Sequence, residues 1–181
     1  MKIVVLANYR TGSTAFCHLL SRMYRIPNFS ELLQRDKTQD DYNKVNFDRY
    51  VIKIMPDQVF EPIFSELIKS SVVYGLYRRD MVQQITSYFV ASQRNVWQNY
   101  DYADRESYSI DYNIEQLTAV VNRIVNLNKD YEEKMKPLCV KEYVYEDIQP
   151  LLQASAFKRY NRPTNYEDLF TTVKKLVNNN L

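Results

Sequence analysis

A short polar segment near the start of the chain has the residue types needed to hold an anion. The sequence Arg10-Thr11-Gly12-Ser13-Thr14 joins an apolar run to an amphipathic one. Arg10 brings a fixed positive charge with a planar fork of donors. Gly12 lets the backbone wrap closely, and the two residues after it add hydroxyl groups. Because the first amides of a helix lack intrahelical partners and lie at the positive end of its dipole, we expect an anion here, with a plain N-capped helix as the alternative.

This loop differs from the phosphate loop of nucleoside triphosphatases. That loop requires two glycines and a lysine directly after the second one. Here there is one glycine, and the cation precedes it. A nucleotide kinase that uses ATP and Mg²⁺ is therefore disfavoured, and it remains as a rival hypothesis.

A second polar group follows another apolar run, at 71–77. Arg79 and Asp80 lie just after this run, and Ser87 is eight residues beyond Arg79. Asp80 is a plausible N-cap, which would put Ser87 two turns into a helix. An arginine on the turn and a serine on the facing side can meet one phosphate through charge-assisted bonds. Taken alone, Arg79 is more simply a solvated or ion-paired turn residue and Ser87 a buried helix serine.

Together the two segments resemble the cofactor motifs of sulfotransferases that use 3′-phosphoadenosine 5′-phosphosulfate (PAPS). The first is similar to that family's 5′-phosphosulfate loop, [KR]-[ST]-G-[ST]-[ST]. The second is similar to a strand followed by Arg-Asp-Pro, with a serine eight residues after the arginine. Met81 replaces the proline, which only presets the helix turn. The resemblance implies that Arg79 and Ser87 bind the 3′-phosphate. It also implies a site for the 5′-phosphosulfate group made of Arg10, Thr11, Gly12, Ser13, Thr14 and Ala15.

Later segments resemble the family less specifically. The sequence at 144–148, Val-Tyr-Glu-Asp-Ile, is similar to its [TY]-Y-E-D-L segment, and 165–169 to a late helix. The R-K-G of the cofactor-covering loop in the animal cytosolic enzymes is absent, and the polar stretch 158–162 is a candidate substitute. The short chain and the arginine-type loop look more like the bacterial, phage or carbohydrate sulfotransferases.

The resemblance implies an in-line sulfuryl transfer, in which charge grows on the leaving oxygen. Arg10 and the loop amides are expected to stabilise that charge. In the bacterial and carbohydrate branches a glutamate soon after the first helix is the base, which implies Glu31 here; a capping role after Ser30 is the alternative. Lys53, at a strand end, is a candidate for neutralising the sulfuryl group or the acceptor, or else a snorkelling lysine. The only histidine, His18, is interpreted as structural.

The acceptor is expected near 94–112, where aromatic side chains gather. Their rings suit a sugar or an aryl group alike, so a small molecule and a carbohydrate both stay open as acceptors. No cluster of cysteine and histidine suggests a metal. Nothing in the sequence sets an oligomeric state. The aromatic residues concerned are Trp97, Tyr100, Tyr102 and Tyr108.

Alternating strand and helix patterns surround these segments. They predict an α/β class with a mostly parallel sheet of about four to five strands and helices on both faces. The resemblance specifies a three-layer fold like that of the P-loop nucleoside triphosphatases, formed by a single domain over 1–181. The predicted strands span 2–7, 50–55, 71–77 and 138–144. The predicted helices span 14–24, 80–92, 114–135, 147–152 and 167–177, with one more opening at Pro56 and a short one near 31–33.

Composition narrows the class of protein. The formal net charge is +2, which argues against a broad nucleic-acid footprint. No apolar run approaches the roughly 18 residues needed to cross a bilayer, and the N-terminal apolar run is too short for a signal peptide. We therefore expect a cytoplasmic protein with reduced thiols and no membrane partner. Cys17, within an apolar helical pattern, is interpreted as a packing residue.

The sequence supports a PAPS-dependent sulfotransferase, with PAPS as donor and no metal. Two alternatives remain. One is the nucleotide kinase described above. The other is a non-catalytic protein that binds PAPS or its product 3′-phosphoadenosine 5′-phosphate (PAP), which would keep Arg79 and Ser87 without turnover.

Overall fold

The computed structural model describes residues 1–31, 48–58, 62–95, 107–153 and 162–179, and it shows an α/β fold. A five-stranded sheet with the order β2-β3-β1-β4-β5 forms its centre, and each neighbouring pair of strands is parallel. The predicted parallel sheet of four to five strands is confirmed. The strands are β1 (Lys2–Ala7), β2 (Asn28–Ser30), β3 (Tyr50–Ile54), β4 (Val72–Tyr77) and β5 (Lys141–Val144).

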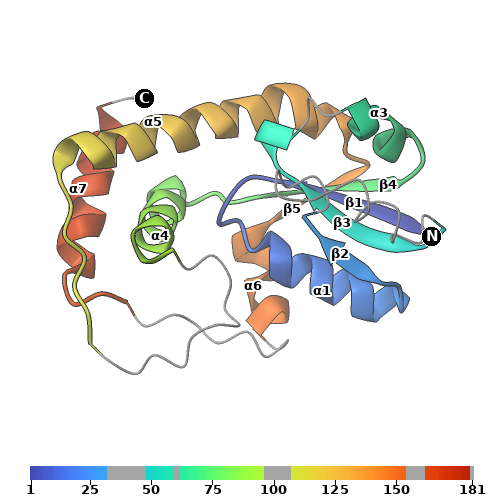
Figure 1. Cartoon of the computed structure of the whole chain (residues 1–181), viewed down its shortest axis with the longest axis horizontal. Coiled ribbons are helices and arrows are strands. Elements are labelled where there is room, and N and C mark those ends of the chain that lie inside the picture. The colour runs from blue at the N-terminus through green and yellow to red at the C-terminus, as the bar shows by residue number, and fades with distance from the viewer. Residues whose placement is uncertain (32–47, 59–61, 96–106, 154–161, 180–181) are drawn as a thin grey trace.

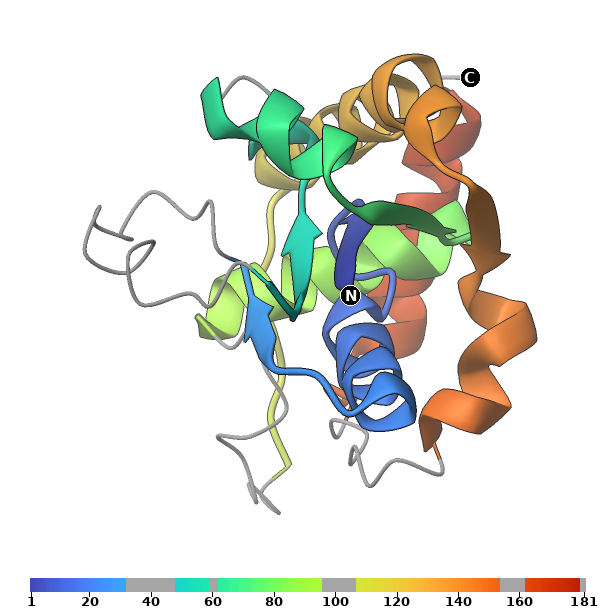
Figure 2. The ribbon, with the colours of Figure 1, turned by 90° about the vertical axis from the view of Figure 1, so that its right-hand side faces the viewer.

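Helices cover both faces of the sheet, as Figures 1 and 2 show. On one face lie α1 (Ser13–Tyr24) and α6 (Tyr145–Gln153), and on the other α3 (Pro62–Lys69) and the π turn η2 (Tyr131–Met135). No helix in the described ranges is long and apolar enough to cross a bilayer. The other helices are η1 (Pro56–Gln58), α4 (Met81–Arg94), α5 (Ile114–Asp130), η3 (Lys136–Leu138) and α7 (Tyr166–Asn178).

The two faces of the sheet follow from alternation along the strands. In β1, Ile3 and Val5 pack with α1 and α6, while Val4 and Leu6 pack against the opposite layer. All four side chains are fully buried. A strand that is covered on both faces has a continuous apolar sequence. The apolar run at 2–7 therefore predicts β1 correctly.

A third core lies beyond the carboxyl ends of the strands. Apolar side chains of α4, α5 and α7 form it, including Phe89, Leu117 and Val173. In Figure 1, α4 and α7 stand at the left and α5 runs from there along the top of the molecule. Strand β4 leads into α4. The helical cluster therefore faces the edge of the sheet at which the first predicted loop lies.

Four predicted elements differ from the structure. The helix predicted to open at Pro56 is only the 3-10 turn η1 there, and α3 begins at Pro62. Residues 28–30, for which no strand is predicted, form edge strand β2 by pairing with β3, because three residues are too few for a strand pattern to be recognised. The long predicted helix ends as an α-helix at Asp130, and the π turn that follows carries Tyr131 and Met135 into the core. The last strand begins at Lys141, since a 3-10 turn occupies 136–138. The predicted helix near 31–33 extends outside the described residues.

Strands β1 and β4 are neighbours whose chains leave in opposite directions. From β1 the chain passes through α1 toward β2 and β3, while from β4 it passes through α4 and α5 toward β5. A crevice beyond the carboxyl ends of two such strands is where open α/β sheets commonly bind ligands. The first predicted loop follows β1 and the second follows β4, so both lie at this switch point.

Gly75 in β4 leaves room for a buried phenol. A Cβ at this position would overlap the hydroxyl oxygen of Tyr131 and lie 3.0 Å from Cys139 Sγ. The Tyr131 hydroxyl donates to Glu142 Oε1 over 3.1 Å, so it is not free to turn away.

We predict that Gly75→Ala lowers the free energy of unfolding by about 1–3 kcal/mol, the usual cost of overpacking. In a Tyr131→Phe background the same replacement costs less, because the nearest atom is gone. Urea denaturation of the four proteins measures this coupling. An equal cost in both backgrounds would contradict the assignment of the clash to the hydroxyl.

Candidate functional site

In the loop between β1 and α1, the sign of the backbone φ angle alternates from residue to residue. Arg10 has φ 58° and Gly12 has φ 78°, whereas Thr11 between them does not take a positive φ. Such alternation turns successive N–H groups toward one concavity, a pattern known to bind anions. Gly12 is also the N-cap of α1, and no side chain caps this end of the helix. The loop can therefore present backbone donors to an anion.

The hydroxyl side chains of this loop are less available than the sequence predicts. Thr11 is fully buried, and its hydroxyl donates to the Asn8 carbonyl over 2.7 Å. Ser13 is 4% exposed. Thr14 Oγ1 accepts a bond from Lys53. The Thr11 hydroxyl is committed as a donor, whereas Thr14 Oγ1 only accepts and keeps its proton. The backbone amides and the Thr14 hydroxyl are therefore the donors that the loop can offer.

A buried set of amide side chains holds the start of the loop. Gln84 donates to the Tyr9 carbonyl over 2.8 Å, and Asn8 accepts from the Tyr9 amide over 2.7 Å. Asn128 on α5 joins them, accepting from Asn8 at 2.6 Å and donating to Gln84 at 3.1 Å. Asn8 and Gln84 are almost fully buried. The network fixes where β1 turns away, and no spacing in the sequence reveals it because its members lie on three separate elements.

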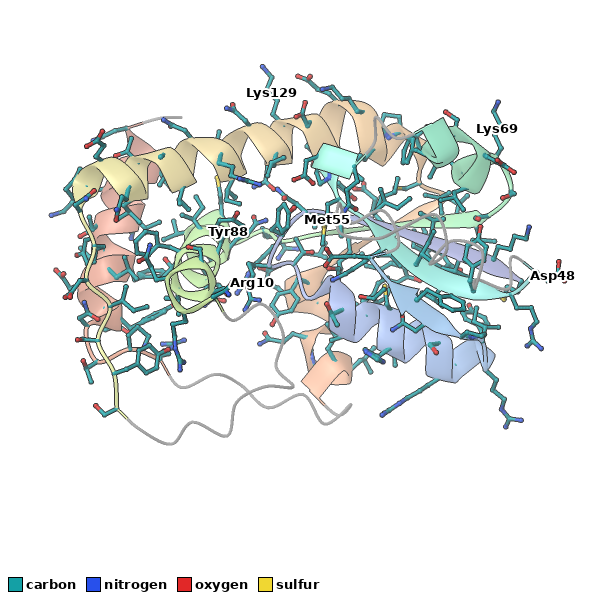
Figure 3. All side chains as sticks on the ribbon, viewed as in Figure 1. Arg10, Asp48, Met55, Lys69, Tyr88 and Lys129 are labelled. Atoms are coloured by element: carbon teal, nitrogen blue, oxygen red, sulfur yellow. The ribbon has the colours of Figure 1, made fainter. Side chains whose placement is uncertain are left out.

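Arg10 and Ser87 meet across the switch point. Arg10 Nε donates to Ser87 Oγ over 3.0 Å. Figure 3 shows Arg10 between the β1–α1 loop and α4. Residues from both predicted cofactor segments are thus adjacent.

Arg79 lies on the side of α6. Its guanidinium Nη2 is 3.5 Å from Asp147 Oδ2, and its side chain is 64% exposed. The described contacts pair Arg79 with α6 and Ser87 with Arg10. A shared phosphate between Arg79 and Ser87 stays a prediction.

Lys53 contacts two other predicted site residues, Thr14 and Glu31. It is opposite Val5 in the sheet, on the face that α1 covers, and only 3% exposed. Its ammonium donates to Thr14 Oγ1 over 2.7 Å and forms an ion pair with Glu31 Oε1 at 2.6 Å. A buried ammonium needs such partners, because leaving it unpaired is costly. The structure places a cation, a carboxylate and the first turn of α1 together.

The first turn of α6 contacts both loops. The Tyr145 ring fills the space beside Gly12, so that a Cβ there would lie 2.6 Å from a ring carbon. Glu146 accepts hydrogen bonds from the amides of Arg79 and Asp80, each over 3.1 Å. Burial by itself raises the pKa of the Glu146 carboxyl, but these amide bonds outweigh it and lower the pKa below 4.5. The sequence identifies this segment only by resemblance and gives no sign of the contacts.

Two other predicted residues lie in α1. Cys17 is fully buried in the core, as its apolar pattern predicts, and burial raises the pKa of its thiol to about 12. The pKa of His18 is lowered, mainly by burial and then by Arg22 and Lys53. Both effects favour the neutral forms of these side chains.

Much of the predicted acceptor region lies outside the described residues. This applies to Trp97, Tyr100 and Tyr102. Most of the segment 158–162, the candidate for the cofactor-covering loop, also lies outside them. Tyr108 is described, and the Arg94 guanidinium lies 4.1 Å from its ring centroid.

The chain matches no protein-family model and no curated protein. Among solved structures, it is similar to the crystal structure of an uncharacterized protein from Eubacterium ventriosum ATCC 27560. The TM-score is 0.44 at 11% identity, over 88% of this chain and 100% of that chain.

We predict that Glu146→Gln is less stable than the wild type at neutral pH and that the difference disappears in acid. The ionised carboxylate binds the two amides only in the folded state. The carboxylate therefore stabilises the fold fully at pH values above 4.5, the ordinary pKa of the group. This stabilisation is lost as the pH falls through the lower pKa of Glu146 in the folded protein. Thermal unfolding between about pH 7 and 3 measures this, in the pH range where carboxylates titrate.

Glu167→Gln is the matched control, since that side chain is 84% exposed. A stability gap for Glu146→Gln that is as large in acid as at neutral pH would contradict the role of the charge.

Proposed function

We propose that this chain is a sulfotransferase that binds PAPS and moves its sulfuryl group to an acceptor hydroxyl. The observation that carries the proposal is the buried Lys53 ammonium, which bonds both to Thr14 in the first turn of α1 and to Glu31. A cation and a carboxylate beside an anion-binding loop are the groups that an in-line transfer requires.

The placement of the loop supports a phosphate-containing donor. It follows the central strand at the switch point of the sheet, and its alternating backbone offers amide donors. Arg10 adds a guanidinium held by Ser87. Fixed donors of this kind suit the 5′-phosphosulfate of PAPS, with Arg79 proposed for the 3′-phosphate. The arrangement is in keeping with the P-loop-like fold that the sequence resemblance implies.

The proposed reaction is a single displacement at sulfur. The acceptor oxygen forms a bond to sulfur while the bond between sulfur and the 5′-phosphate oxygen breaks, and PAP leaves. Arg10 and the loop amides stabilise the charge that grows on the leaving oxygen. Glu31 takes the proton of the acceptor hydroxyl. Lys53 holds Glu31 in place and offers its positive charge to the transferred group.

The acceptor is proposed to be a carbohydrate or another hydroxyl compound of small size. It would approach over the aromatic residues of the segment 94–112. Tyr108, with Arg94 stacked on its ring, is the described residue of that segment which could contact a sugar face.

We predict that PAP binds at least about a hundredfold more tightly than AMP, since a pair of charge-assisted contacts to the 3′-phosphate is worth roughly 3 kcal/mol. Calorimetric titration of the purified protein with PAP, AMP and ATP–Mg²⁺ measures this. Preference for ATP–Mg²⁺, or no binding of PAP, would overturn the proposal in favour of a kinase or a capped helix.

We predict that Glu31→Gln binds PAP as the wild type does and loses at least about a hundredfold in turnover, as expected on removing a general base. The amide oxygen of glutamine still accepts a bond from Lys53, so the site stays assembled. Transfer from sulfur-labelled PAPS to a panel of sugars and phenols measures the rate. Glu115→Gln, an exposed change on α5, is the control, and full activity of Glu31→Gln would remove Glu31 as the base.

A further inference from the structure

Arg78 directly precedes Arg79, and the motifs in the sequence predict no role for it. Along β4, Tyr74 and Leu76 pack on the face covered by α1 and α6. Alternation sends Arg78, two residues further, to the same side. Its side chain is only 8% exposed, whereas the neighbouring Arg79 is 64% exposed. The strand therefore turns Arg78, and not Arg79, toward the core beneath the loop.

The buried guanidinium of Arg78 contacts the backbone of the anion loop. Its Nη1 donates to the Arg10 carbonyl over 3.1 Å, and its Nη2 donates to Gln83 Oε1. The group also lies 4.7 Å from the centroid of the Tyr145 ring, which itself covers Gly12. Arg78 thus reaches both left-handed residues of the loop, one directly and one through Tyr145.

The conformation of Arg10 needs such support. A left-handed backbone costs a residue with a Cβ about 1–2 kcal/mol. A fixed carbonyl acceptor can hold that conformation, and a planar fork is suited to bind it and Gln83 at once. Without the Arg78 guanidinium, we expect Arg10 to relax to a negative backbone φ, so that the loop would lose its left-handed residue at this position.

The charge of Arg78 is only loosely compensated. Among the residues that the structure describes, its carboxylate partner is Glu146, whose Oε1 is 3.8 Å from Nε and also accepts the Asp80 amide. Within the described residues, Nε is buried without a hydrogen-bond partner. Burial lowers the pKa of Arg78, and Tyr145 and Glu146 oppose this shift. A buried positive charge without a close counter-ion is costly in the empty protein and favourable once an anion binds nearby.

We propose that Arg78 is the positioning residue of the anion loop. It fixes the Arg10 carbonyl, and so the left-handed turn, and its charge behind the loop strengthens the binding of an anion in front. The role of the loop in binding PAPS rests on the proposed function, but the hold on the Arg10 backbone does not.

The test compares Arg78→Met, which removes the charge and the fork, with Arg78→Lys, which keeps only the charge. Arg22→Met is the control, because it removes an exposed arginine from the last turn of α1. The first readout is amide hydrogen exchange at residues 11–14 in the protein without ligand. The second is calorimetric affinity for PAP and for inorganic pyrophosphate.

We expect amide exchange in the loop to become about tenfold faster in Arg78→Met, which corresponds to a free energy of local opening lower by about 1.4 kcal/mol. The exchange rate of Arg78→Lys should lie between those of Arg78→Met and the wild type. Affinity for both anions should fall at least about tenfold in Arg78→Met. Exchange and affinity equal to those of Arg22→Met would overturn the proposal. So would wild-type exchange in Arg78→Lys, since a point charge would then suffice.

The two proposals fail in different ways. If the wild type binds neither PAP nor pyrophosphate, the proposed function is wrong, and the exchange rates still decide whether Arg78 holds the loop. If Arg78→Met does not fold, Arg78→Lys carries the same comparison.

Discussion

The chain leaves its central strand through two left-handed residues, Arg10 and Gly12, and this turn constrains everything around it. Arg10 takes a conformation that a side chain disfavours, so it persists only where neighbours hold the backbone. Gln84 holds the Tyr9 carbonyl and Arg78 holds that of Arg10. The turn thus depends on contacts from the β4 end and α4.

Three cations lie close to this turn. Lys53 is buried and paired with Glu31, Arg10 donates to Ser87 Oγ, and Arg78 lies 3.8 Å from Glu146. A chain with a net charge of only +2 thus gathers three basic side chains at one place. A local cluster, rather than overall charge, is what an anion would meet.

Elements that depend on residues along one strand or helix are recognisable in the sequence. The buried β1 and the Asp80 cap of α4 are confirmed, since apolar runs and capping residues are local signals. Lys53 and Glu31 are each recognisable in the sequence as candidates, and the structure brings them together. Strand β2 is not predicted, because its three residues are too few to show a pattern. The π turn is not predicted either, since it has no pattern of its own.

The sequence by itself determined the α/β class and the parallel sheet. It also determined that one polar loop follows each of two strands. Hydrophobic periodicity and turn residues are local features, so a few neighbouring positions are enough to recognise them. Only the tertiary structure decided which side chains meet. In the fold, Arg10 donates a hydrogen bond to Ser87 and Arg79 pairs with Asp147 of α6. Arg78 is buried beneath the loop, where it donates to the Arg10 carbonyl. These pairings join residues about seventy positions apart in sequence. They depend on strand order and on which face each strand end presents, which no local pattern encodes.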